Sequence, residues 1–435
     1  MKSMPKTLLL SLMCYSISHA SSSLEVEAFT TKTGVPVLFY QAMDVPMVHI
    51  NLAFHAGSAF DGQRFGLSTL TTRLLNQGNQ GQDANLIADE LANVGAQYSA
   101  ESNQDMALIS LKTLSRPNTL NAAVKTLASI VQHPDFPGHA FLREKNQQLI
   151  RIQQTQESPD DVADQTFFQA LYQAHPYAHP IDGNQETLKA ITPGDVQQFY
   201  QHFFTQKNVH VILVGAIDAS KAREIATMLT QDLPIGQKIP PIKKARPLAT
   251  EMDIEVPFNA SQTVLRIGQV GIDHQNTQYF PLLIGNYILG GGSLVSQLAY
   301  ELREKRGLTY GVYSDFTPMP GLGPFIIRAS TQTQQATTAE TLIRETLTRF
   351  IQQGPSPQEL TAAKAYLTGS FPVSLASNQS LVAILTKIAF YDLPKDYLNH
   401  YIDNIQSITQ EDIKKAFQSQ VNPKKLLQVS VGTHE

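Results

Sequence analysis

The chain has 435 residues, of which 42% are hydrophobic and 16% are charged. This balance is ordinary for a globular protein and far from the low hydrophobicity and high charge of disordered chains. The formal net charge of -4 provides no excess of basic groups to attract phosphates, so nucleic acid is not an expected partner.

The first 20 residues have the features of a signal peptide. Lys2 and Lys6 are basic, residues 8–17 are mainly apolar, and the sequence SHA at 18–20 ends on a small residue. The apolar stretch is shorter than the roughly 20 residues that cross a bilayer, which argues against a membrane anchor. We therefore expect residues 1–20 to be removed on export. The protein would then be periplasmic or secreted, without a membrane-spanning segment.

The single cysteine, Cys14, lies inside this segment. A mature chain without a thiol can form no disulfide, thiolate metal site or cysteine nucleophile. Such a composition suits an oxidising compartment, where a stray thiol is a liability.

The remaining sequence contains an internal repeat. Ile191-Thr192 recurs as Ile408-Thr409, and the strand-like VHVILVG at 209–215 recurs as LLQVSVG at 426–432; the differences 408 − 191 and 432 − 215 are both 217. Each copy reads as a capped helix that leads into a buried strand.

The match extends upstream with helical and strand patterns of the same kinds. Phe141 and Lys145 correspond to Leu360 and Lys364 in a second helical segment. Alternating strands are expected at 48–54 and 263–270, each followed by an apolar helix. Two homologous halves of roughly 200 residues each are implied.

Residues 235–247 (IGQKIPPIKKARP) are rich in proline, lysine and glycine and lack apolar periodicity. They indicate an exposed linker. We predict an N-terminal domain at 21–235, a linker at 236–248 and a C-terminal domain at 249–435. Because strands and helices do not follow a strict βαβ order, we expect the α+β class, with a mixed, mainly antiparallel sheet covered by helices in each half.

In the first half, the segment 66–73 (GLSTLTTR) follows an expected strand end and should begin a helix that continues to 76–78. This arrangement resembles the pitrilysin/insulinase family of zinc peptidases. Active members carry the inverted motif H-x-x-E-H on this helix, where two histidines bind zinc and the glutamate polarises its water. The resemblance places Thr69, Thr72 and Arg73 at the His, Glu and His positions, so all three are replaced.

The family's third zinc ligand is a glutamate on a later helix. Its position here corresponds to Arg151, or to Ile150 if the alignment shifts by one residue. Neither side chain can bind zinc. Two arginines would also repel a dication, by about 4 kcal/mol for a pair of unit charges 4 Å apart at an effective dielectric constant of 20. We therefore expect this chain to bind no metal or other cofactor.

The closely spaced histidines His175 and His179 are an alternative metal pair. Pro180 disfavours helix at His179, and Pro176 could occupy only a first turn, so the two rings are not expected to share a helix face. The stretch resembles the family's H-P-Y-x-x-P-x-x-G loop, a structural signature. Two further histidines, His49 and His55, lie on an expected strand and its exit and are read as ordinary strand residues.

In the second half, residues 286–310 (NYILGGGSLVSQLAYELREKRGLTY) give the most specific match. The glycine run lacks the Gly-Lys-Ser/Thr ending of a phosphate loop. An alternative interpretation is a plain turn that caps the next helix through Ser293. The resemblance implies that Arg303 and Tyr310 reach a zinc site in the other half or in a partner, where they stabilise the oxyanion of peptide hydrolysis. Alternatively, Arg303 complements a helix C-terminus and Tyr310 packs in the following strand.

These residues lead to two hypotheses of different classes. The resemblance first implies a non-catalytic subunit of a heteromeric peptidase, which supplies Arg303 and Tyr310 to a zinc-bearing partner with an H-x-x-E-H motif. The substrate would be a peptide or an unfolded polypeptide. The second hypothesis is a peptide-binding or scaffolding protein of the same fold. An independently active peptidase with displaced ligands is not favoured, because no other His/Glu cluster is visible.

Overall fold

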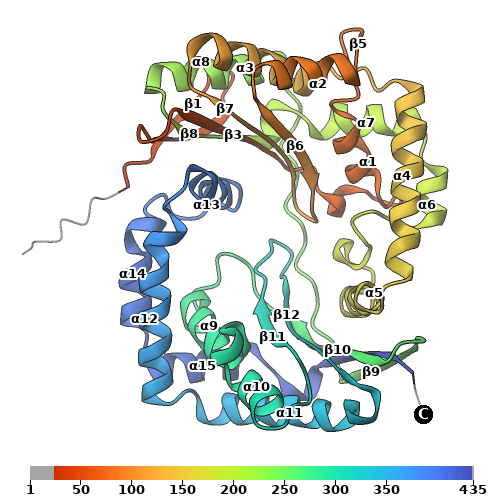
Figure 1. Ribbon diagram of the computed structural model, residues 1–435, viewed down its shortest axis with the longest axis vertical. Coiled ribbons are helices and arrows are strands. Elements are labelled where there is room, and N and C mark those ends of the chain that lie inside the picture. The colour runs from red at the N-terminus through yellow and green to blue at the C-terminus, as the bar shows by residue number, and fades with distance from the viewer. Residues whose placement is uncertain (1–23, 434–435) are drawn as a thin grey trace, which may run out of the picture.

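The computed structural model describes residues 24–433, so the expected signal peptide at 1–20 lies outside the described part. Figure 1 shows two halves, one above the other, each built on a β-sheet. The first sheet has the strand order β1-β2-β8-β3-β7-β6 and the second has the order β11-β12-β10-β13-β9. Only the pairs β2–β8 and β9–β13 are parallel within these two sheets, which confirms the predicted α+β class with mixed, mainly antiparallel sheets.

The strands of the first sheet are β1 (Glu27–Thr30), β2 (Pro36–Gln41), β3 (Met47–Phe54), β6 (Gln97–Ser102), β7 (Ala107–Leu114) and β8 (Val209–Gly215). Those of the second are β9 (Met252–Pro257), β10 (Gln262–Val270), β11 (Val312–Phe316), β12 (Pro324–Gln332) and β13 (Leu427–Gly432). A small hairpin of β4 (Gly78–Asn79) and β5 (Gln82–Asp83) lies outside both sheets.

The helices of the first half are α1 (Leu67–Leu74), α2 (Ala84–Asn93), α3 (Pro117–Gln132), α4 (Gly138–Gln156), α5 (Pro159–Tyr172), α6 (Gln185–Ala190), α7 (Pro193–Phe203) and α8 (Ala219–Thr230). Those of the second half are α9 (Tyr279–Asn286), α10 (Gln297–Ala299), α11 (Ala336–Gln353), α12 (Pro357–Ser374), α13 (Asn378–Phe390), α14 (Tyr397–Ser407) and α15 (Gln410–Gln420). The expected helix after Gly66 is shorter than predicted, because α1 ends at Leu74.

The internal repeat is visible in matching hydrogen bonds. Helices α7 and α15 both begin with a capping box. In this motif the side chain of the capping residue accepts from the backbone N–H three residues later, and the side chain of that later residue accepts from the backbone N–H of the capping residue. The ammonium of Lys145 on α4 donates to the carbonyl oxygens of Lys189 and Ile191. Lys364 on α12 donates in the same way to the carbonyl oxygen of Gln406. These lysines therefore fix the two equivalent helix ends in both halves.

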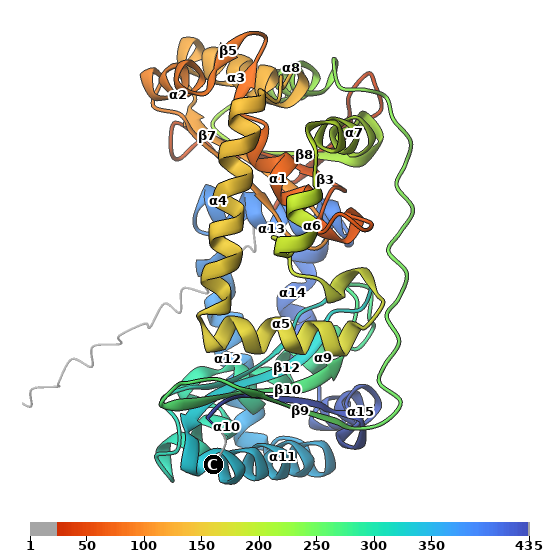
Figure 2. The ribbon, with the colours of Figure 1, turned by 90° about the vertical axis from the view of Figure 1, so that its right-hand side faces the viewer.

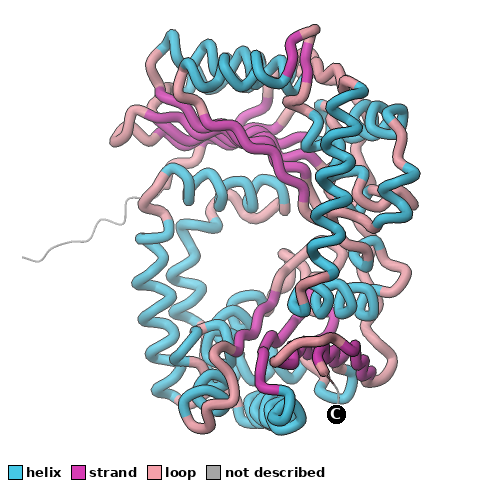
Figure 3. Tube along the Cα trace, turned by 45° about the vertical axis from the view of Figure 1, so that its right-hand side comes forward, coloured by secondary structure: helices cyan, strands magenta, loops and turns pink. Residues whose placement is uncertain are grey.

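Each half covers the sheet of the other half with one helix. Helix α5 of the first half packs on β10 and β13, and α13 of the second half packs on β3 and β8. Figures 1 and 3 show α13 below the upper sheet and α5 above the lower one. Fully buried Phe167 of α5 lies in one apolar cluster with Val429, and Leu385 of α13 lies in another with Ile212. Burying such side chains contributes roughly 1.5–3 kcal/mol each.

No helix or strand lies between α8 and β9 in the described chain, and Figure 2 shows this segment running along the outside of the molecule. The predicted linker at 236–248 falls within it. Our expectation that it is exposed was wrong for Ala245 and Leu248, which are buried in the apolar cluster around Tyr177. The Ala245 N–H donates to the Gly321 carbonyl, which holds this part of the segment against the second half.

Among residues 24–433, no single helix is long and apolar enough to cross a bilayer. Helices α12 and α13 pass that test only as a pair, and they meet at a bend of 108°.

Candidate functional site

Helix α1, which carries the expected zinc-motif positions, is fixed at its start by a buried carboxylate. Asp61 accepts hydrogen bonds from the N–H groups of Gly66 and Ser68, both at 2.7 Å, so two first-turn donors of the helix are satisfied. Gly66 has φ +93°, and a Cβ there would lie 2.4 Å from the carbonyl oxygen of Asp182. The close approach positions α1 directly against the loop 181–183.

Thr69 and Thr72 occupy the expected His and Glu positions and are both buried. The Thr69 hydroxyl donates to the Ile181 carbonyl over 2.9 Å. The Thr72 hydroxyl is fully buried and has no hydrogen-bond partner within the described structure. Neutral threonine hydroxyls replace an imidazole and a carboxylate here, so neither a strong zinc ligand nor a general base remains at these positions.

Arg151 lies on the face of α4 that is turned toward α1. Its Nε is 3.9 Å from Oδ2 of Asp182. Burial, and then the positive charge of nearby Arg73, lower the pKa of Arg151, whereas Asp182 and Glu144 oppose this change. Ile150, the other aligned position, is 56% exposed and belongs to another face of α4. The four replaced positions are therefore neighbours in space.

Two of these four side chains, Thr69 and Arg73, border a pocket of about 280 Å³, here called the α1–β6 pocket. It is lined by Thr69 and Arg73 of α1, by residues 100–102 of β6, and by Ile181 and Asp182 of the adjoining loop. An arginine occupies one expected ligand position and another occupies the third, so the residues do not fit a zinc ion. No group of three or more His, Cys, Asp or Glu side chains within residues 24–433 could hold a metal ion.

His175 and His179 are separated by the short 3-10 helix η2 (Pro176–Ala178). The His175 ring is 2.6 Å from the Lys243 carbonyl oxygen, and the His179 ring stacks on Phe65 at 4.2 Å between ring centroids. Each ring is therefore engaged with a different neighbour, as expected for a structural loop.

Sequence reasoning missed Asp182, which lines the pocket, and Gln148, which binds the backbone of Asp182. Gln148 is fully buried on α4, and its amide donates to the carbonyl oxygens of Gly66 and Asp182 at 3.0 and 2.9 Å. Its spacing of three residues from Arg151 places it on the same helix face and could have revealed it. Asp182 carried no such local signal, because it lies in an irregular loop.

The second half holds the other expected residues. The chain there forms π-helical turns η4 (Tyr287–Gly291) and η6 (Tyr300–Glu304), with η5 (Ser293–Val295) and α10 between them. The helix cap is the hydroxyl of Ser296, which accepts from the Ala299 N–H at 3.3 Å. The alternative interpretation, a plain turn that caps the next helix through Ser293, is therefore wrong.

Arg303 lies in the last turn of η6, with its Nε 3.9 Å from Oε1 of the adjacent Glu304. Tyr310 precedes β11 and is 86% exposed, so it does not pack in that strand. In Figure 1, α10 lies at the bottom of the second half and α1 lies in the upper half. No hydrogen bond or ion pair within the described chain joins Arg303 or Tyr310 to the α1–β6 pocket.

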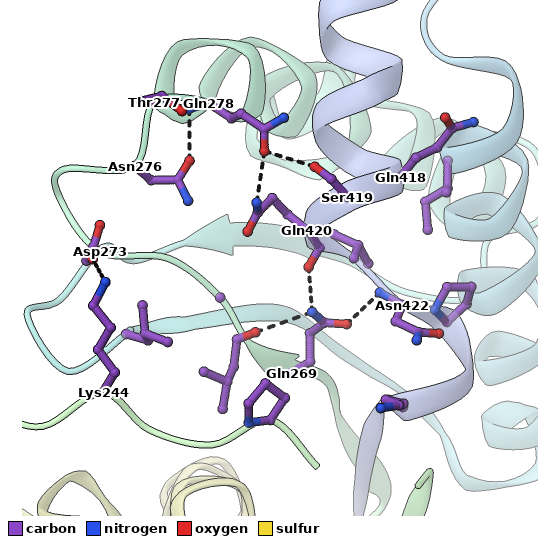
Figure 4. Close-up of a pocket in the computed structure, with 18 of the residues that line it drawn as sticks. Lys244, Gln269, Asp273, Asn276, Thr277, Gln278, Gln418, Ser419, Gln420 and Asn422 are labelled. Carbon is purple, nitrogen blue, oxygen red and sulfur yellow. Dashed lines mark hydrogen bonds and ion pairs between the residues drawn. The ribbon is translucent and has the colours of Figure 1, made fainter. Parts of the chain in front are cut away.

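The second half also has a larger pocket of about 990 Å³ between β10, the start of α9 and the end of α15. Figure 4 shows that its side chains bind one another. The Gln269 amide donates to the Gln420 carbonyl and its oxygen accepts from the Asn422 N–H. Lys244 pairs with Asp273 at 2.9 Å. These side chains already have hydrogen-bond or ion-pair partners within the described chain.

Comparison with known proteins identifies the class. Residues 37–185 match the profile of insulinase (peptidase family M16), and residues 190–367 match that of the peptidase M16 inactive domain. A crystal structure of a peptidase M16 inactive domain from Pseudomonas fluorescens has a TM-score of 0.92 and 35% identity, covering 95% of this chain and 98% of that one. The chain belongs to the insulinase family, peptidase family M16.

Two curated relatives carry different names. The uncharacterized zinc protease YmxG of Bacillus subtilis is 25% identical over 360 residues, covering 82% of this chain and 86% of the relative. The non-peptidase homolog YmxG of Helicobacter pylori is 24% identical over 387 residues, or 87% of each chain. Together with the replaced positions in α1 and α4, these matches identify a zinc-less, non-catalytic member of the family.

Proposed function

We propose that this chain is the zinc-less subunit of a heteromeric peptidase and supplies Arg303 and Tyr310 to a zinc-bearing partner of the same family. One observation supports this most directly: Tyr310 is 86% exposed and makes no hydrogen bond with residues 24–433. Arg303 has only the long contact with Glu304. Both side chains are thus available to another chain.

The chemistry of the pair suits peptide hydrolysis. A guanidinium and a phenol can donate hydrogen bonds to the oxyanion that forms on the scissile carbonyl, and such donors act mainly in the transition state. The partner would supply zinc, which activates the attacking water. This chain would hold the substrate backbone and stabilise the developing charge.

The surroundings of the pair favour contact with another protein. Four large apolar side chains on the same stretch of chain are more than half exposed: Leu294, Val295, Tyr300 and Tyr313. Exposed apolar and aromatic groups gathered on one segment are typical of protein interfaces. We further propose that the complex forms after export, on the basis of the signal-like residues 1–20.

A second candidate function is peptide binding without hydrolysis, which the edge strand β6 favours. Strand β6 pairs with β7 alone, so its other edge can accept an added strand. A pocket of about 540 Å³ lies beside it, lined by β3, β6, β7 and α13. The α1–β6 pocket adjoins residues 100–102 of the same strand.

Copurification from the native source tests the first function. The expected result is a complex with an H-x-x-E-H subunit that hydrolyses unfolded peptides, whereas the isolated chain is inactive. A chain that purifies without any such subunit, yet retains peptides, would reject the heteromeric peptidase and favour the binding protein.

A further inference from the structure

We infer that Glu301 is a positioning residue, which holds the π-helical turn η6 in the shape that presents Arg303 to the substrate of the complex. The inference rests on the proposed role of Arg303 and Tyr310. It adds a residue that touches neither substrate nor partner and acts through Arg303.

The carboxylate of Glu301 gathers three cations, although its side chain is only 14% exposed. Nη1 of Arg306 donates to Oε2 of Glu301 and, at 2.8 Å, also to its carbonyl oxygen. The ammonium of Lys305 lies 3.6 Å from the same Oε2, and Nη2 of Arg349 on α11 lies 3.6 Å from Oε1. The hydrogen bond from Arg306 is the largest cause that lowers the pKa of Glu301. A charge-assisted hydrogen bond with further cations beside it holds its neighbours more firmly than one exposed ion pair.

The backbone of η6 shows which conformation this carboxylate favours. The Lys305 N–H donates to the Tyr300 carbonyl oxygen, five residues earlier, at 2.9 Å. In an α-helix, residues five apart lie about 140° apart around the axis. A turn closed by bonds over five residues is wider and brings such residues onto one side. The contact between Glu301 and Arg306, also five residues apart, therefore stabilises the π-helical turn relative to an α-helix.

Glu301 also separates Arg303 from the other cations of the turn. The sequence REKR at 303–306 has three positive side chains in four residues. Lys305 and Arg306 both pair with Glu301. Within the described chain, Arg303 has only the 3.9 Å contact with Glu304. Because the other two charges are engaged, a single guanidinium of this turn is presented to an oxyanion.

The Tyr310 end of the segment is fixed to the sheet instead. The hydroxyl of Thr331 on β12 donates to the Leu308 carbonyl oxygen at 2.6 Å, two residues before Tyr310. This contact does not involve Glu301. A change at Glu301 should therefore displace Arg303 and leave Tyr310 in place.

The first measurement uses the isolated chain and needs no partner. Glu301→Gln removes the charge and keeps the size of the side chain. Hydrogen–deuterium exchange should be at least about tenfold faster for the amides of residues 300–308, because charge-assisted hydrogen bonds are lost. Arg306→Gln breaks the same contact from the other side and should give the same increase. The double variant should give no further increase, because both changes remove one interaction.

Glu411→Gln is the matched control. Glu411 also pairs with a lysine four residues later, Lys415 at 3.5 Å, but on α15. Its removal should leave the exchange of residues 300–308 unchanged. Circular dichroism verifies folding, and if Glu301→Gln does not fold, Arg306→Gln decides, since Arg306 is 34% exposed. Exchange at the wild-type rate in the folded variants overturns the inference.

The second measurement is turnover in the complex with the zinc-bearing subunit. Glu301→Gln should lower kcat between about tenfold and 10²-fold, with a smaller effect on KM, because misplacement of a group that stabilises the transition state has effects of this size. In the Arg303→Ala background the same change should have no further effect. Combined with Tyr310→Phe, the two losses should multiply.

The inference is overturned if Glu301→Gln keeps full kcat, or if its loss multiplies with that of Arg303→Ala. A general loss of stability would produce the second result. Failure of the proposed function gives a different pattern, in which Arg303→Ala itself keeps full turnover. The catalytic part of the inference then fails with it, while amide exchange of the isolated chain still shows that Glu301 holds the turn.

Discussion

Tyr391 of the second half donates its hydroxyl hydrogen to Oδ2 of Asp105 in the first half, over 3.1 Å. The other oxygen of this carboxylate accepts from Tyr177 at 2.5 Å, and the Tyr177 hydroxyl in turn accepts from the Gly321 N–H at 3.1 Å. One buried carboxylate thus connects the hairpin β6–β7 with the hairpin β11–β12 and with the end of α13.

Asp105→Asn should change the pH dependence of stability. Burial raises the pKa of Asp105 from 3.8 to about 6, although the hydrogen bonds from Tyr177 and Tyr391 oppose this rise. A carboxyl with a raised pKa stabilises the folded state most below pH 4, and this contribution is lost as the pH rises through 6. The loss corresponds to about 3 kcal/mol. Urea unfolding of both proteins from pH 4 to 8 gives the difference.

The stability of the wild type must be compared with that of Asp105→Asn, because the titration of other groups changes stability with pH in the opposite direction. His274, with its pKa lowered to about 4, stacks on Tyr391 at 3.7 Å, and Lys387 and Asp273 also act on it. If the difference between wild type and Asp105→Asn is flat across this range, the carboxyl does not titrate as proposed.

Acidification should destabilise the chain through three partly buried imidazoles. Burial lowers the pKa of His55, His210 and His274 to about 4. A group with a lowered pKa contributes stability above pH 6.5, and this contribution is lost as the pH falls toward 4. Thermal unfolding of His274→Gln should show a shallower decline of Tm below pH 6.5 than the wild type. An unchanged slope would show that His274 is not buried in its neutral form.

Zinc binding should require rebuilding of the centre in both α1 and α4. The variant Thr69→His, Thr72→Glu, Arg73→His lacks the third ligand, so we expect weak zinc binding. Addition of Arg151→Glu should raise the affinity, because it supplies a carboxylate and removes a repelling charge. Isothermal titration calorimetry with zinc measures both.

Ile150→Glu in the same triple variant is the matched control. Ile150 is exposed on another face of α4, so a carboxylate there should add little. Equal affinities for the Arg151→Glu and Ile150→Glu versions would contradict the placement of Arg151. About one zinc per unmodified chain after dialysis would contradict the zinc-less assignment itself.

Arg303→Ala and Tyr310→Phe should lower turnover in the complex with the zinc-bearing subunit. An oxyanion donor acts mainly in the transition state, so each change should reduce kcat about 10²–10³-fold with a smaller effect on KM. Tyr313→Phe, also exposed on this segment, is the control and should keep full turnover. Size-exclusion chromatography verifies assembly. Full turnover of both variants in intact complexes would show that the pair is not catalytic.

The amino-acid sequence alone determined the two-half architecture and the loss of the zinc site. Periodicity and capping are local, so β8 and β13, with the capped helices α7 and α15 before them, could be predicted from the repeat. The side chains of Thr69, Thr72 and Arg73 lack the imidazoles and the carboxylate of the zinc motif, and this holds wherever the helix lies in the fold. Arg303 and Tyr310 could be proposed as a pair from their motif, but only the structure shows how exposed their side chains are.

Only the tertiary structure decided which distant groups meet. Helices α5 and α13 each pack on the sheet of the opposite half. The sequence repeat does not predict this exchange, because both sheets offer an apolar face on which either helix could pack. The contacts of Asp105 with Tyr391, and of Arg151 with Asp182 and Arg73, depend on how loops and helices pack. Side-chain packing over such separations follows from the whole fold, and a local pattern carries no information about it. The ion pair of Glu301 with Arg349 became visible only in that packing.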